Sequence, residues 1–282
     1  MNPEISIIIP CYKQAQYLEE ALQSVLEQTF MDWECIIVDD GSPDNTGEIA
    51  QLWLNKDSRF KYFNKENGGL CSARNFGIAQ ALGKFILPLD ADDYIAKEYV
   101  AEAMECFQND ASLKIVYCKA QKFGSSNELW ELPIFSSHNL SRKNMIFCSA
   151  FFRKEDWESV GGYDLNMIYG WEDWEFWIAI LKNGGNVKCI DAVRFFYRTK
   201  PSSMLTQVEE QQGEHLLEYV GVKHADFFVK HYGSFQKMEH EAERAVEEYK
   251  YKLKSEKFAI DVFCSAFFGF SIFGKYKRQK DK

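Results

Sequence analysis

The chain has 282 residues, of which 46% are hydrophobic and 27% charged, and its formal net charge is −9. That length suits one large domain, or one domain with a smaller extension. The composition excludes a wholly disordered or collagen-like chain. The acidic balance argues against a general nucleic-acid binder, which needs a basic face for phosphates. The eight cysteines include no Cys-x-x-Cys pair, which favours reduced, buried thiols over disulfides or a zinc site.

The first half of the chain alternates short apolar runs with amphipathic patterns. The apolar runs predict strands at 5–10, 35–39, 60–64, 85–89 and 115–118. The amphipathic patterns predict helices at 17–28, 46–54 and 71–82, with one more before the fifth strand. Such an alternation predicts an α/β fold in which helices flank a mostly parallel sheet.

The second half changes character twice. Residues 121–141 are polar and irregular, and they are followed by a predicted strand at 145–152 and a predicted helix at 171–183. Two short strands are expected at 187–190 and 194–197, and residues 208–257 read as two or more helices. We therefore place a boundary near 205, with a domain at 1–205 and a helical C-terminal extension at 206–282.

Three predicted strands end in polar residues, and two of these ends are acidic. Asp39 and Asp40 follow one strand, and Asp90-Ala91-Asp92-Asp93 follows another. Ligands of open α/β sheets bind at the carboxyl ends of the strands. Neighbouring carboxylates repel each other unless a cation lies between them, and Mg²⁺ and Mn²⁺ accept carboxylate oxygens.

The Asp90-Ala91-Asp92 stretch suits a cation in its local geometry as well. In an extended segment, residues i and i+2 point the same way, so Asp90 and Asp92 can face one pocket. The small Ala91 leaves room for a ligand to approach the backbone. A lone Asp-x-Asp is nevertheless common, and it is equally typical of an acidic turn that ends a strand.

A second polar stretch lies at a strand-to-helix junction. Asn67-Gly68-Gly69 precedes the predicted helix, and Arg74 lies on that helix. Glycines let the backbone approach a ligand, and an arginine can pair with a carboxylate or a phosphate. A helix start with a surface arginine would show the same pattern.

Taken together and in order, these stretches resemble the motif series of glycosyltransferase family 2 over roughly residues 5–205. The matching segments are Ile7-Ile8-Ile9-Pro10-Cys11-Tyr12, Val38-Asp39-Asp40-Gly41-Ser42, Asn67-Gly68-Gly69 with Arg74-Asn75, and Leu89-Asp90-Ala91-Asp92-Asp93. The resemblance implies a GT-A fold of Rossmann-like type and a transfer reaction from a nucleotide-sugar donor.

The resemblance also implies roles for single residues. Pro10 and Tyr12 would line the pocket of the nucleotide base, Asp40 would bond a uracil-type base, Asn67 and Arg74 would hold the nucleotide side, Asp90 would contact ribose or sugar, and Asp92 would coordinate the metal. Asp39 and Asp93 would be supporting neighbours. The cofactor is expected to be a divalent metal, Mn²⁺ or Mg²⁺, with the choice left open.

The acceptor hydroxyl must lose a proton during transfer, and a positioned carboxylate can take it. Candidates lie in the predicted helix at 171–183, where Trp174, Trp177 and Leu181 mark the buried stripe. Asp173 falls at the edge of that stripe and Glu172 nearly opposite it. Both this geometry and the family's Glu-Asp motif favour Asp173 as the base, with Glu172 in support.

Other residues near this motif have weaker assignments. An exposed Trp171 could stack on a sugar face or simply pack in its loop. Arg198 and Lys200 lie in a segment that resembles one carrying a basic residue near the diphosphate, where cations would neutralise the leaving group. Many relatives have a histidine near Lys200, which leaves the role of Lys200 open, and Arg198 could equally be a surface residue.

An apolar stretch at 258–273 and a basic tail at 275–282 close the sequence. The stretch is too short and too interrupted for a membrane span. It suits either docking on an anionic membrane surface or packing on protein. With no signal peptide recognised, we expect a cytoplasmic protein, or a peripheral one at the inner face of the plasma membrane.

The sequence therefore predicts an inverting, metal-dependent glycosyltransferase with a donor that is a UDP-sugar. The acceptor would be a hydroxyl of a glycan or a lipid-linked molecule in cell-surface polysaccharide or glycoconjugate synthesis. Two alternatives remain: an inactive homologue that binds sugar nucleotides or glycans, and a sugar nucleotidyltransferase. The latter would need a Gly-rich basic loop after the first strand, which Pro10-Cys11-Tyr12 does not supply.

Overall fold

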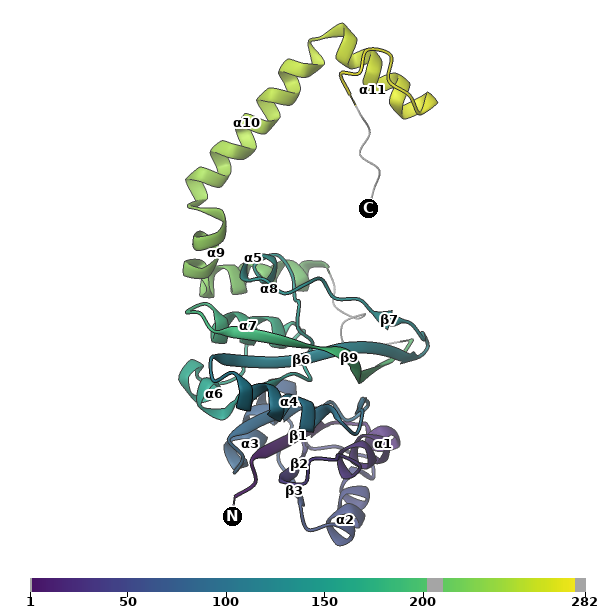
Figure 1. Cartoon of the computed structure of the whole chain (residues 1–282), viewed down its shortest axis with the longest axis vertical. Coiled ribbons are helices and arrows are strands. Elements are labelled where there is room, and N and C mark those ends of the chain that lie inside the picture. The colour runs from purple at the N-terminus through teal and green to yellow at the C-terminus, as the bar shows by residue number, and fades with distance from the viewer. Residues whose placement is uncertain (1, 202–209, 277–282) are drawn as a thin grey trace. The chain divides into compact units, whose positions relative to one another are not determined.

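A computed structural model describes residues 2–201 and 210–276 (Figure 1). The contacts divide the chain into two compact units, residues 1–227 and 228–282. The predicted boundary near 205 lies outside the described residues. Among the described residues, no helix is long and apolar enough to cross a membrane.

The first unit is built on the predicted parallel strands. In chain order these are β1 (Ile5–Cys11), β2 (Trp33–Asp39), β3 (Phe60–Asn64) and β4 (Phe85–Pro88). They lie in the order β3-β2-β1-β4, and each neighbouring pair is parallel. Both β1 and β2 are buried along their whole length, which explains why they read as continuous apolar runs.

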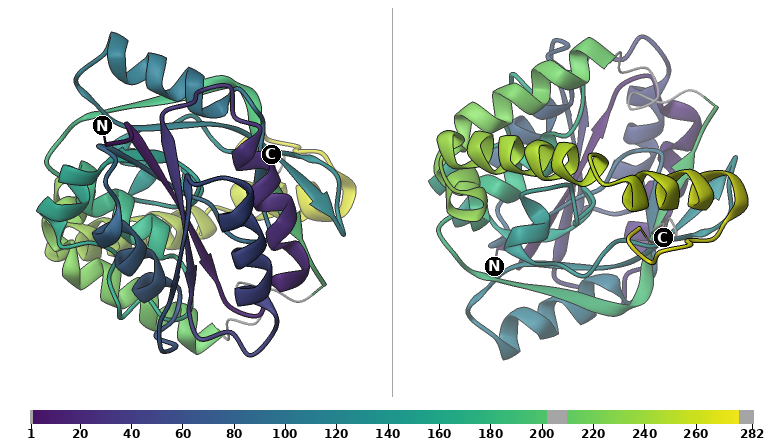
Figure 2. Two further views of the ribbon diagram at one scale, coloured as in Figure 1. Left: turned by 90° about the horizontal axis from the view of Figure 1, so that it is seen from below. Right: turned by 90° about the horizontal axis from the view of Figure 1, so that it is seen from above.

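Helices cover both faces of these strands, as Figure 2 shows. They are α1 (Ala15–Leu26), α2 (Thr46–Lys56) and α3 (Leu70–Gln80), all close to their predicted positions. Gly77 lets α3 approach the sheet, because a Cβ there would lie 2.6 Å from Ile8 Cγ2 and 2.9 Å from Val38 Cγ2. Arg74, three residues earlier and on the same side of α3, is thereby carried towards the sheet.

The sheet continues beyond β4 with mixed pairing. The remaining strands are β5 (Tyr94–Ile95), β6 (Leu113–Gly124), β7 (Leu129–Trp130), β8 (Phe151–Arg153) and β9 (Asn186–Thr199). β8 is antiparallel to both β4 and β6, whereas β6 and β9 run parallel. The whole is an α/β fold with a mostly parallel sheet flanked by helices, as predicted.

The predicted strand at 145–152 is mostly wrong, because only its end belongs to β8. Residues 145–150 are largely buried but bond to side chains instead of to a neighbouring strand. Trp177 Nε1 donates to the Ile146 carbonyl at 2.9 Å, and the Tyr99 hydroxyl donates to the Ser149 carbonyl at 2.8 Å. An apolar run predicts burial, and here burial comes without a strand.

The two short strands expected at 187–190 and 194–197 are one continuous strand, β9. Its pairing with β6 shifts register between Cys118 and Ala120, which accommodates the polar interruption at Asp191. β6 itself extends well past the predicted residue 118, so part of the region expected to be irregular is strand.

The remaining helices are α4 (Tyr99–Asn109), α5 (Ser137–Leu140), α6 (Lys154–Val160), α7 (Glu172–Leu181), α8 (Glu210–Lys223), α9 (Ala225–Tyr232), α10 (Phe235–Leu253) and α11 (Glu256–Phe268). The helical character predicted after residue 208 is confirmed for the described part. Within the second unit, no α10 side chain is buried.

Candidate functional site

Asp40 lies just beyond the end of β2 and organises the loop that follows β3. Its carboxylate accepts hydrogen bonds from the Gly69 amide at 2.8 Å and the Gly68 amide at 3.0 Å, and it pairs with Lys65 Nζ at 2.5 Å. Asn67 Nδ2 donates to the Asp40 carbonyl at 2.8 Å. Asp40 and Asn67 therefore contact each other, and together they fix the glycine loop before α3.

Asp39, the last residue of β2, holds the neighbouring turn. It accepts from the Ser42 amide at 2.7 Å and from the Tyr62 hydroxyl at 2.8 Å, and it helps raise the pKa of Tyr62 to about 12, after burial. On β1 next to it, Pro10 is buried, whereas Tyr12 is 42% exposed. Tyr12 thus presents a ring at the carboxyl edge of the sheet.

Arg74 is the centre of a buried ion-pair network. Its side chain is fully buried, and it donates to Asp90 Oδ1 at 2.7 Å and to Glu172 Oε1 at 2.6 Å. The two carboxylates come from the end of β4 and the start of α7, so one guanidinium joins three elements. In this structure the Arg74 guanidinium therefore bonds to protein carboxylates.

Asp92 and Asp93 lie against the end of β9. Lys200 Nζ pairs with Asp92 Oδ2 at 2.6 Å, and the Arg198 amide donates to Asp93 Oδ1 at 2.7 Å. Burial, reinforced by the charges of Asp92 and Asp90, holds the pKa of Asp93 well above its usual range. Arg198 and Lys200, whose roles the sequence left open, thus lie beside the acidic stretch, and Ala91 is buried.

Arg198 is more than a surface residue. Its Nε donates to the Asp92 carbonyl at 2.8 Å, and its guanidinium also pairs with Glu20. The guanidinium lies over the Phe123 ring at 4.3 Å and the Tyr17 ring at 4.5 Å. These contacts fix the backbone of the acidic stretch and leave the Lys200 ammonium as the cation at the Asp92 carboxylate.

Asp173, in the first turn of α7, has a carboxylate that protein groups orient. Asn144 Nδ2 donates to Asp173 Oδ2 at 2.8 Å, and the Trp174 amide donates to Oδ1 at 2.7 Å. Burial, followed by the charge of Glu172, raises the pKa of Asp173 to about 7. A carboxyl group with a pKa near neutrality is suited to exchange protons at neutral pH.

The predicted orientation of Glu172 is wrong. The sequence placed it nearly opposite the buried stripe of the helix, but its side chain is buried and bonded to Arg74. The reason is that α7 buries almost all its sides, including the charged Glu175. A one-face analysis fails for a helix that is packed all round.

Trp171 lies at the junction before α7 in a left-handed backbone conformation, with φ 57°. Its ring meets the Trp174 ring at a centroid distance of 6.3 Å, and its side chain is half-buried. The preceding Gly170 also has positive φ, at 116°. Two successive left-handed residues give the turn that directs Glu172 and Asp173 into the first unit.

Sequence reasoning missed two residues that contact this site. Asn144 orients Asp173, and Cys148 Sγ lies 3.5 Å from Asp90 Oδ2. Acidic oxygens of Asp90 and Asp93 and the Cys148 sulfur lie within 4.8 Å of one another. Neither Asn144 nor Cys148 belongs to a recognisable motif, so no sequence signal singled them out.

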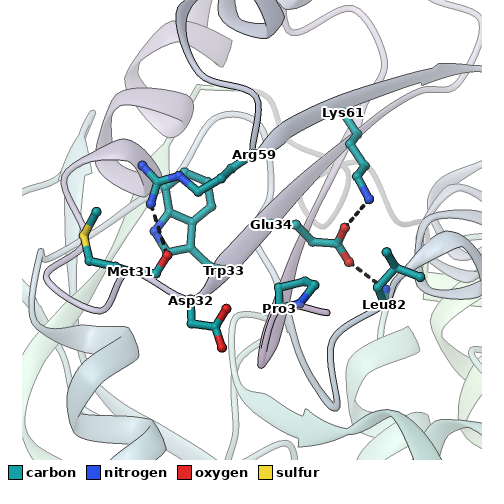
Figure 3. Close-up of a pocket in the computed structure, with 8 residues that line it drawn as sticks. All are labelled: Pro3, Met31, Asp32, Trp33, Glu34, Arg59, Lys61 and Leu82. Carbon is teal, nitrogen blue, oxygen red and sulfur yellow. Dashed lines mark hydrogen bonds and ion pairs between the residues drawn. The ribbon is translucent and has the colours of Figure 1, made fainter. Parts of the chain in front are cut away.

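A distinct pocket lies at the opposite edge of the sheet, where β1, β2 and β3 begin. Figure 3 shows its lining, in which Glu34 accepts from Lys61 Nζ at 2.5 Å and from the Leu82 amide at 2.6 Å. Glu34 and Lys61 are therefore already paired with each other. The acidic stretches and Asp173 are therefore not part of this pocket.

Comparison with known proteins decides the family. A family model described as glycosyl transferase family 2 matches residues 6–169, more than half of the chain. The chain belongs to this family. The protein named uncharacterized glycosyltransferase EpsJ of Bacillus subtilis is 31% identical over 251 residues, which cover 83% of this chain and 72% of EpsJ. The protein is thus a family 2 glycosyltransferase.

Solved structures agree on the fold. TarS 1–349 of S. aureus, in complex with UDP-GlcNAc, has a TM-score of 0.65 at 20% identity and covers 82% of this chain and 71% of that chain. PcManGT of Pyrobaculum calidifontis, in complex with GDP-Man and Mn²⁺, has a TM-score of 0.58 at 16% identity, with 94% and 85% covered. The predicted GT-A fold is confirmed.

Longer relatives match over part of their length. Chondroitin synthase of Pasteurella multocida is 31% identical over 166 residues, which cover 57% of this chain and 17% of the synthase. The chain therefore spans a small part of that relative.

In this family 2 transferase, helix α8 is tied to the segment that precedes α7. Lys223 Nζ lies 2.5 Å from Asp164 Oδ2 and 2.7 Å from Glu175 Oε1, and His224 Nε2 lies 2.6 Å from that same Glu175 oxygen. Tyr219 also donates to Asp164, at 2.7 Å. α8 thus holds both ends of the turn that presents Asp173.

We expect Lys223→Met to lower the free energy of unfolding by about 1 kcal/mol, because water partly screens this half-exposed ammonium. The loss of its bonds to Asp164 and Glu175 is the cause. Urea unfolding followed by circular dichroism measures the change. Lys182→Met, which removes a surface pair with Asp226, is the control and should be nearly neutral. Equal losses in the two variants would contradict a structural role for Lys223.

Proposed function

We propose that the protein moves a sugar from a nucleotide-diphosphate sugar to an acceptor hydroxyl, with inversion at the anomeric carbon and Asp173 as the base. The observation that carries the proposal is the oriented Asp173 carboxylate with its pKa near 7. Asp173 takes the acceptor proton, and the acceptor oxygen attacks the anomeric carbon. The bond from that carbon to the diphosphate breaks, and the nucleoside diphosphate leaves.

The donor would lie along the carboxyl edge of β1, β2 and β4. Tyr12 offers an exposed ring for the base, and Asp40 and Asn67 shape the glycine loop beside it. A UDP-sugar is our first candidate, supported by the motif series and by a structural neighbour in complex with UDP-GlcNAc. Because another neighbour is in complex with GDP-Man, the nucleotide is the first property to test.

The residues at the end of β4 fit a hard divalent cation. Asp92 and Asp90 keep partly exposed carboxylates, and Asp93 Oδ2 is buried with no hydrogen-bond partner. Carboxylate oxygens suit Mg²⁺ and Mn²⁺, whereas the Cys148 thiol is too soft for them. Asp92 would hold the metal, which when bound would stabilise the negative charge of the diphosphate.

Lys200 competes with a metal for Asp92, because its ammonium already lies 2.6 Å from Oδ2. If Asp92 held a cation, the Lys200 ammonium would be free to neutralise the leaving phosphate. Asp90, bonded to Arg74, would then contact the ribose or the sugar. Lys200 and the proposed metal would therefore both lie close to the donor diphosphate and neutralise its negative charge.

A metal titration tests this assignment. We expect Asp92→Asn to raise the Mn²⁺ concentration that gives half-maximal activity by about tenfold or more, because a ligand oxygen loses its charge. Activity is measured against added Mn²⁺ or Mg²⁺ after treatment with EDTA. Asp110→Asn, at an exposed turn, is the control. If the wild-type protein keeps full activity in EDTA, no metal is needed and Lys200 neutralises the diphosphate in its place.

The acceptor is proposed to be a glycan or a lipid-linked hydroxyl used in polysaccharide or glycoconjugate synthesis. Relatives named chondroitin synthase and hyaluronan synthase support this class. Residues 121–145 and 161–171 would select the acceptor, with Trp171 available to contact a sugar.

Thermal shift with a panel of nucleotide sugars, with and without Mn²⁺, identifies the donor, since a bound donor stabilises the fold.

A further inference from the structure

Helix α11 buries two polar side chains and exposes several large apolar ones. Asp261 and Ser265 are buried, whereas Phe263 is 53% exposed and Phe267 is 72% exposed. With Ile260, these phenylalanines follow the spacing i, i+3, i+7, which places them on one face of the helix. An apolar stripe normally faces a core, so this outward face calls for a partner.

The segment after α11, residues 269–276, runs back beside the helix (Figure 1). The buried Asp261 carboxylate holds it by accepting from the backbone amides of Ile272 at 2.7 Å, Phe273 at 2.7 Å and Lys275 at 2.6 Å. This explains why an aspartate lies on the inner face. The segment 269–276 is therefore anchored to α11, and its side chains Phe270, Ile272 and Phe273 are exposed as well.

We call the result the aromatic patch, defined by its exposed residues Ile260, Phe263, Phe267, Phe268, Phe270, Ile272 and Phe273. Four of its rings form a connected surface cluster. Phe263 lies 4.7 Å from Phe267 and 6.0 Å from Phe268 between ring centroids, and Phe268 lies 6.1 Å from Phe270. Isolated exposed apolar residues are ordinary, but a contiguous cluster marks an interaction surface.

Basic residues accompany the patch. Lys257 Nζ lies 5.7 Å from the Phe273 ring centroid, and Lys275 follows the patch in the return segment. By sequence, residues 275–282 carry five lysines or arginines and one aspartate, a net charge of +4, in a chain whose total is −9. In the sequence, positive charge is thus concentrated directly after the residues of the aromatic patch.

We propose that the aromatic patch, with Lys257 and Lys275 beside it, docks on the surface of an anionic lipid bilayer, with the rings at the level of the headgroups. Exposed aromatic side chains beside lysine and arginine suit that interface, where apolar insertion and charge attraction add. A second copy of the chain fits less well, because it would bring two basic tails together. The proposal goes beyond sugar transfer and does not depend on the donor or the acceptor.

Vesicle co-sedimentation of the full-length protein tests the proposal. The vesicles are phosphatidylcholine alone or phosphatidylcholine mixed with phosphatidylglycerol. We expect binding to the anionic vesicles, weakening as salt is raised because the charge attraction is screened. The double substitution Phe267→Ser with Phe268→Ser should lower the partition coefficient by about tenfold or more, since two exposed rings are lost.

Phe235→Ser is the matched control, because Phe235 is 73% exposed in the same unit but lies on α10, outside the patch. It should bind as the wild type does, and all variants should keep the wild-type thermal transition. Transfer to a water-soluble acceptor should also be unchanged, which separates this test from the proposed function. Wild-type vesicle binding by the double variant, or no preference for anionic lipid, would overturn the proposal. So would a change in mass by light scattering without a change in vesicle binding, which would assign the patch to self-association.

Discussion

Replacing Asp173 by Asn is expected to lower kcat for sugar transfer by about 10²–10⁴-fold, the usual contribution of a general base. The substitution keeps the shape of the side chain and an oxygen that can accept from Asn144 Nδ2. It removes the ability to take the acceptor proton. Steady-state kinetics with the donor found by the thermal-shift panel measures the loss.

The thermal stability of Asp173→Asn shows whether its loss of activity comes from the missing base or from unfolding. The folded-state pKa of Asp173, about 7, lies above its usual value of 3.8, so the folded protein disfavours the ionised form. That cost is absent below about pH 3.8, grows as pH rises from there to about 7, and stays constant at higher pH. A neutral Asn avoids it, so Asp173→Asn should combine this loss of kcat with an equal or higher Tm at pH 8.

The pH dependence of the wild type follows from the same shift. A base works when it is deprotonated, so kcat should rise with pH through about 7 and level off above it. Asp226→Asn, at an exposed position on α9, is the control and should keep both kcat and the profile. An Asp173→Asn variant that retains full transfer activity would assign the base to another residue.

Arg74→Met is expected to lower the free energy of unfolding by about 3–5 kcal/mol, the usual cost of removing one partner from a buried ion pair. Two carboxylates, Asp90 and Glu172, would lose the cation that neutralises them. Urea unfolding followed by circular dichroism measures the loss. Activity should fall as well, because Arg74 joins the end of β4 to the start of α7.

Arg59→Met is the matched control, since Arg59 pairs with Asp57 at a partly exposed site. Its effect should be about 1 kcal/mol or less. Glu172→Gln should fall between the two, because Arg74 keeps its bond to Asp90 and Gln still offers an oxygen. Arg74→Met could instead unfold at the same urea concentration as the wild type and only weaken donor binding. Arg74 would then contact the donor, and its buried ion pairs would contribute little to the free energy of unfolding.

Strand ends and motif order in the sequence predicted much of the candidate site. The sequence named Asp40, Asn67, Asp92 and Lys200 as candidates, and the structure adds that Asn67 bonds to Asp40 and that Lys200 pairs with Asp92. The contacts of Asn144 with Asp173 and of Cys148 with Asp90 could not be predicted. They arise because the buried segment at 145–150 bonds to side chains in place of a neighbouring strand.

The helix α7 shows why local periodicity has limits. An analysis of helical periodicity assumes one buried face, and it therefore predicted that Glu172 points away from the interior. Tertiary packing surrounds α7, so Glu172 and Glu175 are both buried, and each has a cationic partner from a distant part of the chain. Whether a carboxylate on such a helix is buried depends on cationic partners from distant parts of the chain, which the spacing of residues within the helix cannot predict.

By itself, the sequence determined the α/β class, the parallel strands β1 to β4 and the acidic strand ends, because apolar runs and turn residues act locally. It also determined the family through the order of its motifs. Only the tertiary structure decided that Arg74 is a buried link between Asp90 and Glu172, and that α8 holds the turn before Asp173. Those outcomes depend on charges brought together from far apart in the chain, where burial decides which of them must pair.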